Sequence, residues 1–120
     1  MKKDNVVRDK SYAFALQIIR LYQYLCNEKK EYVLSKQILR CGTSIGANIE
    51  EAIGGQSKSD VFAKLTIAYK EARETHYWLR SLTDSNYLEP HLSQSLITEC
   101  HELLRLIGSI KKTMKTTRNS

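Results

Sequence analysis

Proline and glycine are scarce in this chain, which has one proline and five glycines in 120 residues. Because these residues interrupt regular elements, their scarcity disfavours many short strands joined by turns and favours a few long helices. No alternating segment of useful length is present, which argues against a sheet. No run approaches about 20 apolar residues, so we expect no membrane span. No apolar segment follows Lys2 and Lys3, so we expect no signal peptide.

Cysteine is also rare in the sequence. Cys26, Cys41 and Cys100 are an odd number at wide spacing, and each falls in an apolar helical pattern. We interpret them as reduced thiols in a core, which is typical of a cytoplasmic protein. With 42% apolar and 27% charged residues, the chain is expected to form one globular domain over residues 1–120.

Motifs for metal binding and catalysis are missing. A di-iron site in a helical bundle needs Glu-x-x-His pairs, and this sequence has none; His76, His91 and His101 stand apart along the chain. There is no Gly-x-Ser-x-Gly turn, and Gly54-Gly55 lacks the Gly-Lys-Ser/Thr ending of a phosphate-binding loop. We therefore expect a protein that is not an enzyme and holds no metal or cofactor.

Apolar periodicity predicts an all-α fold of four helices. The expected helices cover about residues 9–29, 33–53, 58–82 and 90–115, with a frayed tail over 116–120. Short connections make successive helices antiparallel neighbours, so we predict an up-down-up-down four-helix bundle.

Three turn signals support these boundaries. Gly54-Gly55 is expected to give the second helix a left-handed C-terminal cap. Ser57 or Ser59 can cap the third helix, and Pro90 suits the first turn of the fourth.

The first predicted helix carries two adjacent apolar stripes. One stripe contains Phe14, Ile18, Leu21 and Leu25, and the other contains Tyr12, Ala15, Ile19, Tyr22 and Cys26. One stripe suffices for packing on a core. The second predicts a further neighbour, which we interpret as another subunit of an oligomer.

Five residues of the second and third helices are candidates for helix packing or a subunit interface. Gly42 and Gly46 each cost a helix about 1 kcal/mol relative to alanine, which predicts a flat strip where another helix approaches, or else a kink. Asn48 lies in an apolar seam, where a buried amide can fix register; ligand binding is the alternative. Tyr77 and Trp78 suit interface anchors, although their charged surroundings also fit a solvated face.

Positive charge gathers at the ends of the chain, whose net charge is +6. The candidate contacts are Arg105, Lys111, Lys112, Lys115 and Arg118, which follow the last acidic residue, together with Lys2 and Lys3. Lysines at a helix C-terminus complement its dipole, which explains one or two of them. We predict that the rest contact RNA or DNA by charge and shape. The alternative is a protein–protein scaffold in which the lysines only aid solubility.

The second and third helices resemble a known family. The segments QILR (37–40), TSIGANIEE (43–51), GQSKSDVF (55–62) and IAYKEA (67–72) are similar to four-helix bundle proteins encoded by intervening sequences of bacterial 23S rRNA genes. Here Gly46 replaces the family's usual proline and Ala52 its glycine. The resemblance implies a homopentameric ring with no established enzymatic activity. The chain is also similar to accessory proteins of diversity-generating retroelements, which implies a nucleic acid or a nucleic-acid enzyme as partner.

Overall fold

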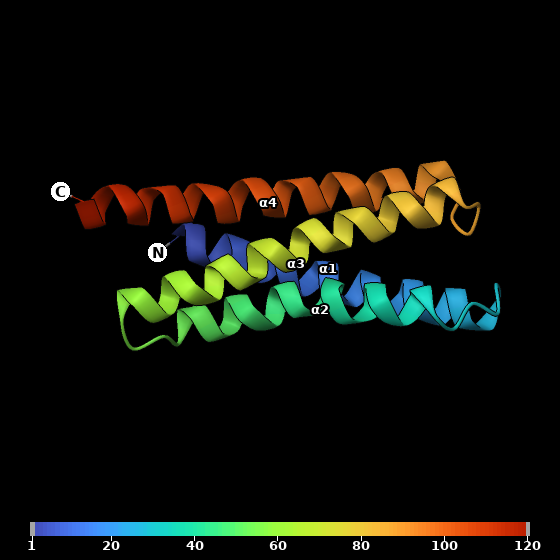
Figure 1. The fold of residues 1–120 in the computed structure, drawn as a ribbon, viewed down its shortest axis with the longest axis horizontal. Coiled ribbons are helices and arrows are strands. Elements are labelled where there is room, and N and C mark those ends of the chain that lie inside the picture. Colours follow the sequence, from blue (N-terminus) through green and yellow to red (C-terminus); the bar gives the residue numbers. More distant parts are fainter. Residues whose placement is uncertain (1, 120) are drawn as a thin grey trace.

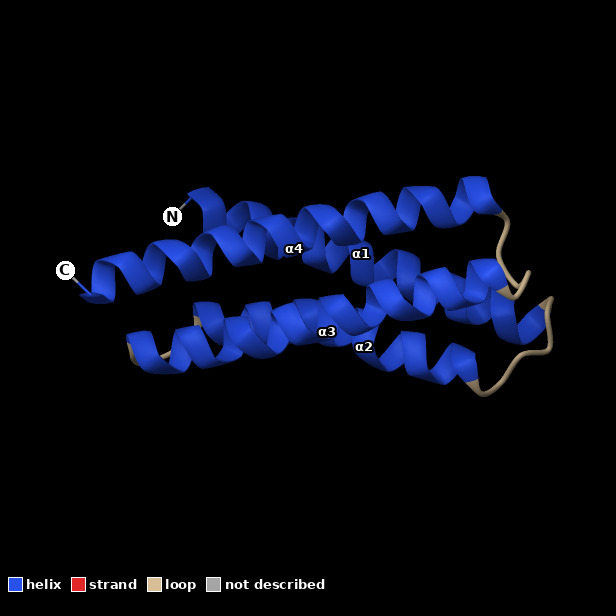
Figure 2. Ribbon diagram, turned by 45° about the horizontal axis from the view of Figure 1, so that its top comes forward, coloured by secondary structure: helices blue, strands red, loops and turns tan. Residues whose placement is uncertain are grey.

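The computed structural model describes the backbone of residues 2–119 and the side chains of residues 6–116. All regular elements in this range are helices: α1 (Lys2–Asn27), α2 (Leu34–Ile53), α3 (Lys58–Asp84) and α4 (Pro90–Asn119). Each helix packs antiparallel on the next, and α4 closes the bundle against α1 (Figure 1 and Figure 2). The predicted four-helix bundle is confirmed.

Two helices extend beyond their predicted ends. α1 begins at Lys2 rather than near residue 9, because no residue from 2 to 8 breaks a helix and Val7 is buried in the core. α4 continues to Asn119. The helix therefore extends into the segment from residue 116 that is expected to fray, since no glycine or proline follows Gly108 to end it.

The end of α2 also differs from expectation. Gly54 has a φ of −86°, so the left-handed cap predicted at Gly54-Gly55 does not form. Glycine is required at Gly55 because neighbouring atoms leave no room for a side chain, and not because of its backbone conformation. A Cβ atom on Gly55 would lie 2.8 Å from Val61 Cγ2 and 3.0 Å from the carbonyl oxygen of Ala52.

The helix starts are set by local hydrogen bonds. Ser57 caps α3 by accepting a hydrogen bond of 3.1 Å from the Asp60 amide, and α4 starts at Pro90, as the sequence predicts. At the start of α2, the Glu31 carboxylate accepts hydrogen bonds from backbone amides, the shortest being 2.7 Å from Ser35. Burial opposes the charged form of Glu31, but these amide bonds outweigh burial and lower its pKa.

One hydrophobic core runs the length of the bundle. Its largest fully buried side chains are Val7, Phe14, Ile18, Leu25, Ile38, Ile45, Ile49, Leu79, Leu82, Leu103 and Ile107. The first predicted stripe of α1 therefore faces the core. The second stripe is exposed at Tyr12 and Ile19 and partly buried at Ala15, Tyr22 and Cys26. These residues and the outer sides of α3 and α4 form much of the surface of the bundle.

Candidate binding surfaces

The outer side of α1 exposes apolar side chains. Tyr12, Leu16 and Ile19 are 61%, 38% and 37% exposed. Together with Ala47 and neighbouring residues of α2, they line a groove of about 310 Å³ between the two helices. We call this surface the apolar face. Large apolar side chains gathered around a groove are typical of protein interaction sites.

The glycines of α2 lie beneath the apolar face. A Cβ atom on Gly42 would lie 2.8 Å from two atoms of Ile18, and one on Gly46 would lie 3.2 Å from the backbone oxygen of Ser11. Both glycines therefore let α1 and α2 of the same chain approach closely. α2 continues unbroken from Leu34 to Ile53 through both positions.

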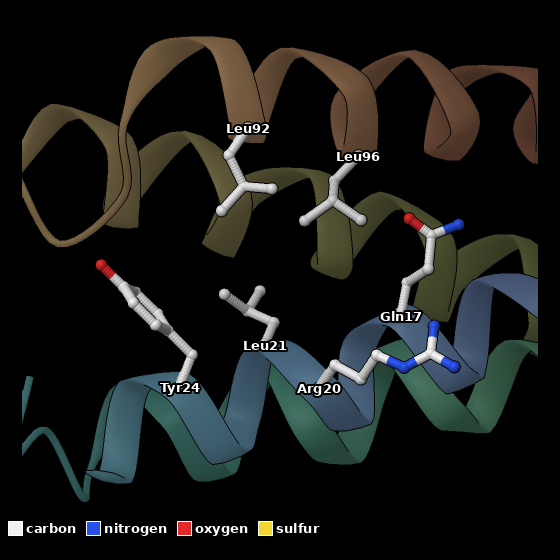
Figure 3. Close-up of a pocket in the computed structure, with 6 residues that line it drawn as sticks. All are labelled: Gln17, Arg20, Leu21, Tyr24, Leu92 and Leu96. Atoms are coloured by element: carbon white, nitrogen blue, oxygen red, sulfur yellow. The ribbon is translucent and has the colours of Figure 1, made fainter. Parts of the chain in front are cut away.

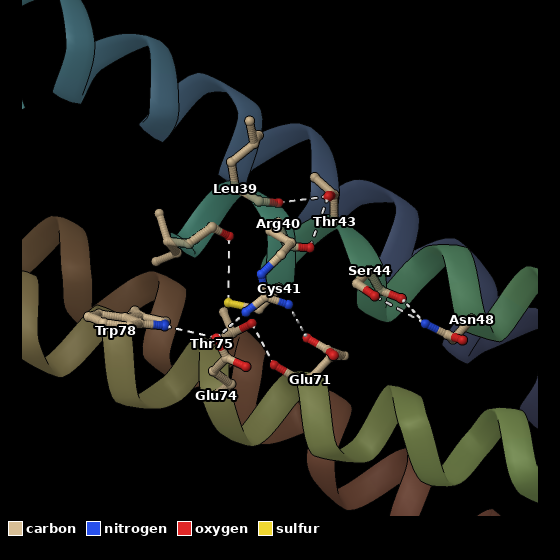
Figure 4. A network of polar contacts seen from close by, with 11 residues as sticks. Leu39, Arg40, Cys41, Thr43, Ser44, Asn48, Glu71, Glu74, Thr75 and Trp78 are labelled. Atoms are coloured by element: carbon tan, nitrogen blue, oxygen red, sulfur yellow. Dashed lines mark hydrogen bonds and ion pairs between the residues drawn. The ribbon is translucent and has the colours of Figure 1, made fainter. Parts of the chain in front are cut away.

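A polar network joins α2 to α3 (Figure 4). Arg40 Nη1 donates to Glu71 Oε2 at 3.3 Å, its Nη2 pairs with Glu74, and Trp78 Nε1 donates to Glu74 Oε2 at 3.1 Å. Burial disfavours the charged guanidinium, but Glu74 and Glu71 outweigh it and raise the pKa of Arg40. Both carboxylates of this part of α3 are thus turned towards α2.

Two other interface candidates lie close to this network. Asn48 is buried, and its Nδ2 donates to the backbone oxygen of Ser44 at 2.8 Å and to Ser44 Oγ at 3.1 Å, within its own helix. Tyr77 is 52% exposed and meets the Trp78 ring edge-on, with centroids 5.0 Å apart. Of these residues, only Tyr77 offers a large free surface to a partner.

The cysteines are free thiols, and two of them are buried. Burial raises the pKa of Cys41 to about 11 and that of Cys100 to about 12, so both are protonated at neutral pH and poor nucleophiles. Among the described residues, no group of three or more His, Cys, Asp or Glu side chains is placed to hold a metal ion. Within the same part of the chain, none of the helices combines the length and the apolar composition of a membrane-spanning segment.

The outer side of α3 and α4 is basic. It carries Arg73, His76 and Arg80 from α3, and His101, Arg105, Lys111, Lys112 and Lys115 from α4. We call this surface the basic face. The histidines join its two halves, because His76 Nε2 lies 2.9 Å from His101 Nε2 and the rings stack with centroids 4.5 Å apart.

The acidic residues of these spans point away from the basic face. Between residues 62 and 80 of α3 the only carboxylates are Glu71 and Glu74, which both bind Arg40 on α2. Between residues 101 and 115 of α4 the only one is Glu102, which pairs with Lys10 Nζ of α1 at 3.1 Å. Positive charge on the basic face therefore has no carboxylate beside it from either span.

The contact between His76 and His101 was not predicted, because the two residues are 25 positions apart and the sequence gives no register between α3 and α4. Burial lowers the pKa of His76, and the charges of His101, Arg80 and Arg73 lower it further. Because the charges of Arg73 and Arg80 lower the pKa of His76, both arginines lie close enough to the histidine pair to interact with it. The arginines and histidines therefore form one continuous basic face.

A groove between α3 and α4 lies at the end of the basic face. It measures about 440 Å³ and is lined by Phe62, Thr66, Tyr69, Gly108, Lys111, Lys112 and Lys115. Lys111 Nζ lies 5.3 Å from the centroid of the Phe62 ring and 5.2 Å from that of Tyr69, within reach of a cation–π interaction. The sequence predicts the three lysines as contacts but does not identify the two aromatic rings beside them.

The remaining predicted contacts belong to the same end of the molecule. Figure 1 shows that α1 begins and α4 ends at the end of the bundle that also holds the connection from α2 to α3. The side chains of Lys2, Lys3 and Arg118 lie outside the described residues. Arg105 lies one helical turn beyond His101 on the basic face.

A third hollow, of about 310 Å³, lies between α1 and α4 (Figure 3). Leu21, Leu92 and Leu96 point into it, with Tyr24 at its edge. The Gln17 side chain beside them donates to Glu99 Oε1 at 2.9 Å on α4. Arg20 also lines this mainly apolar hollow, so it holds one charged side chain where the basic face carries several cations.

Comparisons with known proteins agree with the fold. Residues 3–109 match the model of the 23S rRNA-intervening sequence protein family. A crystal structure of a protein of unknown function from the S23 ribosomal protein family of Bacteroides thetaiotaomicron is 53% identical, with a TM-score of 0.90. The similarity covers 92% of this chain and 98% of that one. No curated protein matches the chain. The family match ends before Lys111, Lys112 and Lys115.

Proposed function

The chain belongs to the 23S rRNA-intervening sequence protein family, and from this premise we propose that it is a non-enzymatic, self-associating protein that binds RNA or DNA through its basic face. Family membership supplies the fold but no specific activity. The proposal therefore depends on the chemistry of this chain's own surfaces.

The observation that carries the proposal is the separation of charge on α3 and α4. Glu71, Glu74 and Glu102 pair with cations on α2 and α1, so the lysines, arginines and histidines of the outer side are left to attract an external anion. A nucleic acid presents closely spaced phosphates, and each lysine or arginine that contacts one releases a counterion. Charge and shape, rather than base sequence, would determine such binding.

Self-association would strengthen this binding. The apolar face offers Tyr12, Leu16 and Ile19 around a groove, a surface suited to another copy of the chain. Several copies held together would present several basic faces to one strand, which increases the overall affinity without any new contact. Five copies in a ring is the arrangement that the family resemblance implies.

Charge reversal tests the proposed function. The variant carries Lys111→Glu, Lys112→Glu and Lys115→Glu, and its matched control carries Lys29→Glu, Lys30→Glu and Lys36→Glu, an equal charge change on exposed lysines around the connection from α1 to α2. We expect the variant to lose roughly a hundredfold in affinity in a mobility-shift titration at low salt, and the control to lose much less.

Two results would contradict the proposed function. One is the absence of any RNA or DNA binding at low salt. The other is binding that responds neither to salt nor to the reversed lysines. A second candidate, a protein–protein scaffold, is favoured by the exposed apolar face, and it would gain support if a defined protein partner stayed bound after nuclease treatment.

A further inference from the structure

We propose that the groove between α3 and α4 holds an unpaired base of a single-stranded nucleic acid, stacked on Tyr69 or Phe62, while Lys112 and Lys115 bind the flanking phosphates. This inference rests on the proposed function and narrows it from nucleic acid in general to single strands. We call the site the α3–α4 groove, with the seven lining residues given above.

The groove combines the two kinds of group that single-strand binding needs. Phe62 and Tyr69 are seven residues apart on α3, two helical turns or about 10 Å, and both line the same hollow. Both rings are only partly buried and line the groove, and Lys111, which also lines it, has its Nζ 5.3 Å and 5.2 Å from the two ring centroids. Bases stack on such rings in proteins that bind single strands along a positively charged groove.

The lysines around the rings are available for phosphates. Lys112 and Lys115 are exposed, and no carboxylate is among the residues that line the groove. Burial, together with the charge of Lys115, lowers the pKa of Lys111. A phosphate entering the groove would stabilise the charged form of Lys111 and could draw its ammonium group away from the rings.

The depth of the rings selects against a duplex. Phe62 and Tyr69 are half-buried between two helices, whereas the bases of a duplex are stacked inside it and cannot reach a recessed ring. Duplex phosphates can still reach exposed Lys112 and Lys115. The affinities for single strands and for duplexes should therefore both depend on Lys112 and Lys115, but only the affinity for single strands should depend on Phe62 and Tyr69.

Gly108 leaves room for the base. It lines the groove without a side chain, and a Cβ atom there would make only an ordinary contact, 3.6 Å from Tyr69 Cε2. A leucine at this position would fill the groove without altering any charge. The change separates stacking from electrostatic attraction, which no lysine variant can do.

The experiment measures fluorescence anisotropy of labelled 12-nucleotide oligo-U, 12-nucleotide oligo-dT and a 12-base-pair duplex with the full chain. The variants are Tyr69→Leu, Phe62→Leu and Gly108→Leu. Tyr32→Leu is the matched control, because Tyr32 is a 53% exposed tyrosine in the connection from α1 to α2 and does not line the groove. Circular dichroism melting confirms that each variant is folded. Ultraviolet crosslinking of oligo-U to the unaltered chain, with mass spectrometry, supplies a readout that needs no variant.

We expect Gly108→Leu and at least one ring variant to lose about tenfold in affinity for a single strand, whereas duplex affinity and the Tyr32→Leu control stay unchanged. Crosslinks should map to Tyr69 or Phe62. Equal losses for oligo-U and oligo-dT would indicate stacking alone, and a larger loss for oligo-U would indicate contacts to the ribose. The inference would be overturned if none of the three groove variants changed the affinity for a single strand, or if crosslinks mapped only outside the groove. Salt-dependent binding of the duplex would in that case still support the proposed function. If no nucleic acid binds, both are overturned.

Discussion

The outer side of α1 and α2 exposes Tyr12, Leu16 and Ile19 around a shallow groove, whereas the outer side of α3 and α4 exposes lysine, arginine and histidine around two aromatic rings. The same bundle thus separates an apolar surface from a cationic one. In the proposed function, copies of the chain associate through the apolar face, and the basic faces stay apart because their like charges repel one another. Because the two surfaces are separate, we predict that a substitution in one can alter self-association without altering anion binding, and the reverse.

The largest expected effect comes from placing a charge in the apolar face. Ile19→Asp should prevent self-association, because a buried unpaired carboxylate at an interface is costly. Light scattering at micromolar concentration should then give the mass of one chain, 13.8 kDa. The apparent affinity for a long RNA should fall by roughly a hundredfold as the linked binding sites separate.

Ile67→Asp, at a 40% exposed position on α3, is the control for this change and should leave the assembly mass unaltered. If the unaltered chain is already monomeric, or if Ile19→Asp leaves its mass unchanged, the apolar face is not a self-association surface. Loss of RNA binding without a change in mass would show that the two surfaces are not independent.

An intermediate effect, on the free energy of unfolding, is expected when Gly42 beneath the apolar face or Gly108 in the α3–α4 groove is replaced by alanine. Gly42→Ala puts a Cβ atom 2.8 Å from two atoms of Ile18, and we expect the free energy of unfolding to fall by about 1–3 kcal/mol. Gly108→Ala makes only an ordinary contact with Tyr69 and favours the helix, so it should stabilise the chain by about 0.5–1 kcal/mol. Urea unfolding of both variants measures the contrast, and changes of the same sign would contradict it.

The smallest effect should come from pH, through His76. Burial, together with the charges of His101, Arg80 and Arg73, lowers the folded-state pKa of His76. The unfolded chain therefore takes up a proton more readily as pH falls below about 6.5. The folded state should therefore lose stability from about pH 6.5 down to the depressed pKa, and lose no more from this group below it. Melting temperatures between pH 7.5 and 5 should show this loss.

His76→Gln should reduce the pH-dependent loss, whereas His91→Gln, at an exposed histidine in the first turn of α4, should not. If both variants follow the unaltered chain over this range, the histidine contact does not couple folding to pH. The basic face would then gain charge at low pH without any effect on the bundle.

Periodicity in the sequence was sufficient for features that lie on a single helix. The two stripes of α1 follow from the spacing of Phe14, Ile18, Tyr12 and Ile19, and the helix C-terminal lysines follow from a count of charge. Ser57 and Pro90 identified two helix starts, because capping depends on neighbours in sequence.

Features that need two helices in register could not be predicted. Phe62 and Tyr69 reach Lys111, and His76 reaches His101, only because the α3–α4 turn and the core fix how the helices align. The Gly55 contact with Val61 is similar, since it depends on where α3 begins relative to α2. Periodicity predicts which face of a helix a residue lies on, but it does not predict which residue of the neighbouring helix lies opposite to it.

The up-and-down course of the chain has a practical consequence for anyone who purifies it. Both α1 and α4 have their outer ends at the end of the bundle that holds the connection from α2 to α3 (Figure 1). An affinity tag added after α4 would continue from the helix that carries Lys111, Lys112 and Lys115, and we expect it to compete with a ligand of the α3–α4 groove. The turn after α3, around Ser85 and Asn86, lies at the far end of a molecule 51 Å long. A fluorophore or surface tether attached there would leave both the groove and the apolar face open.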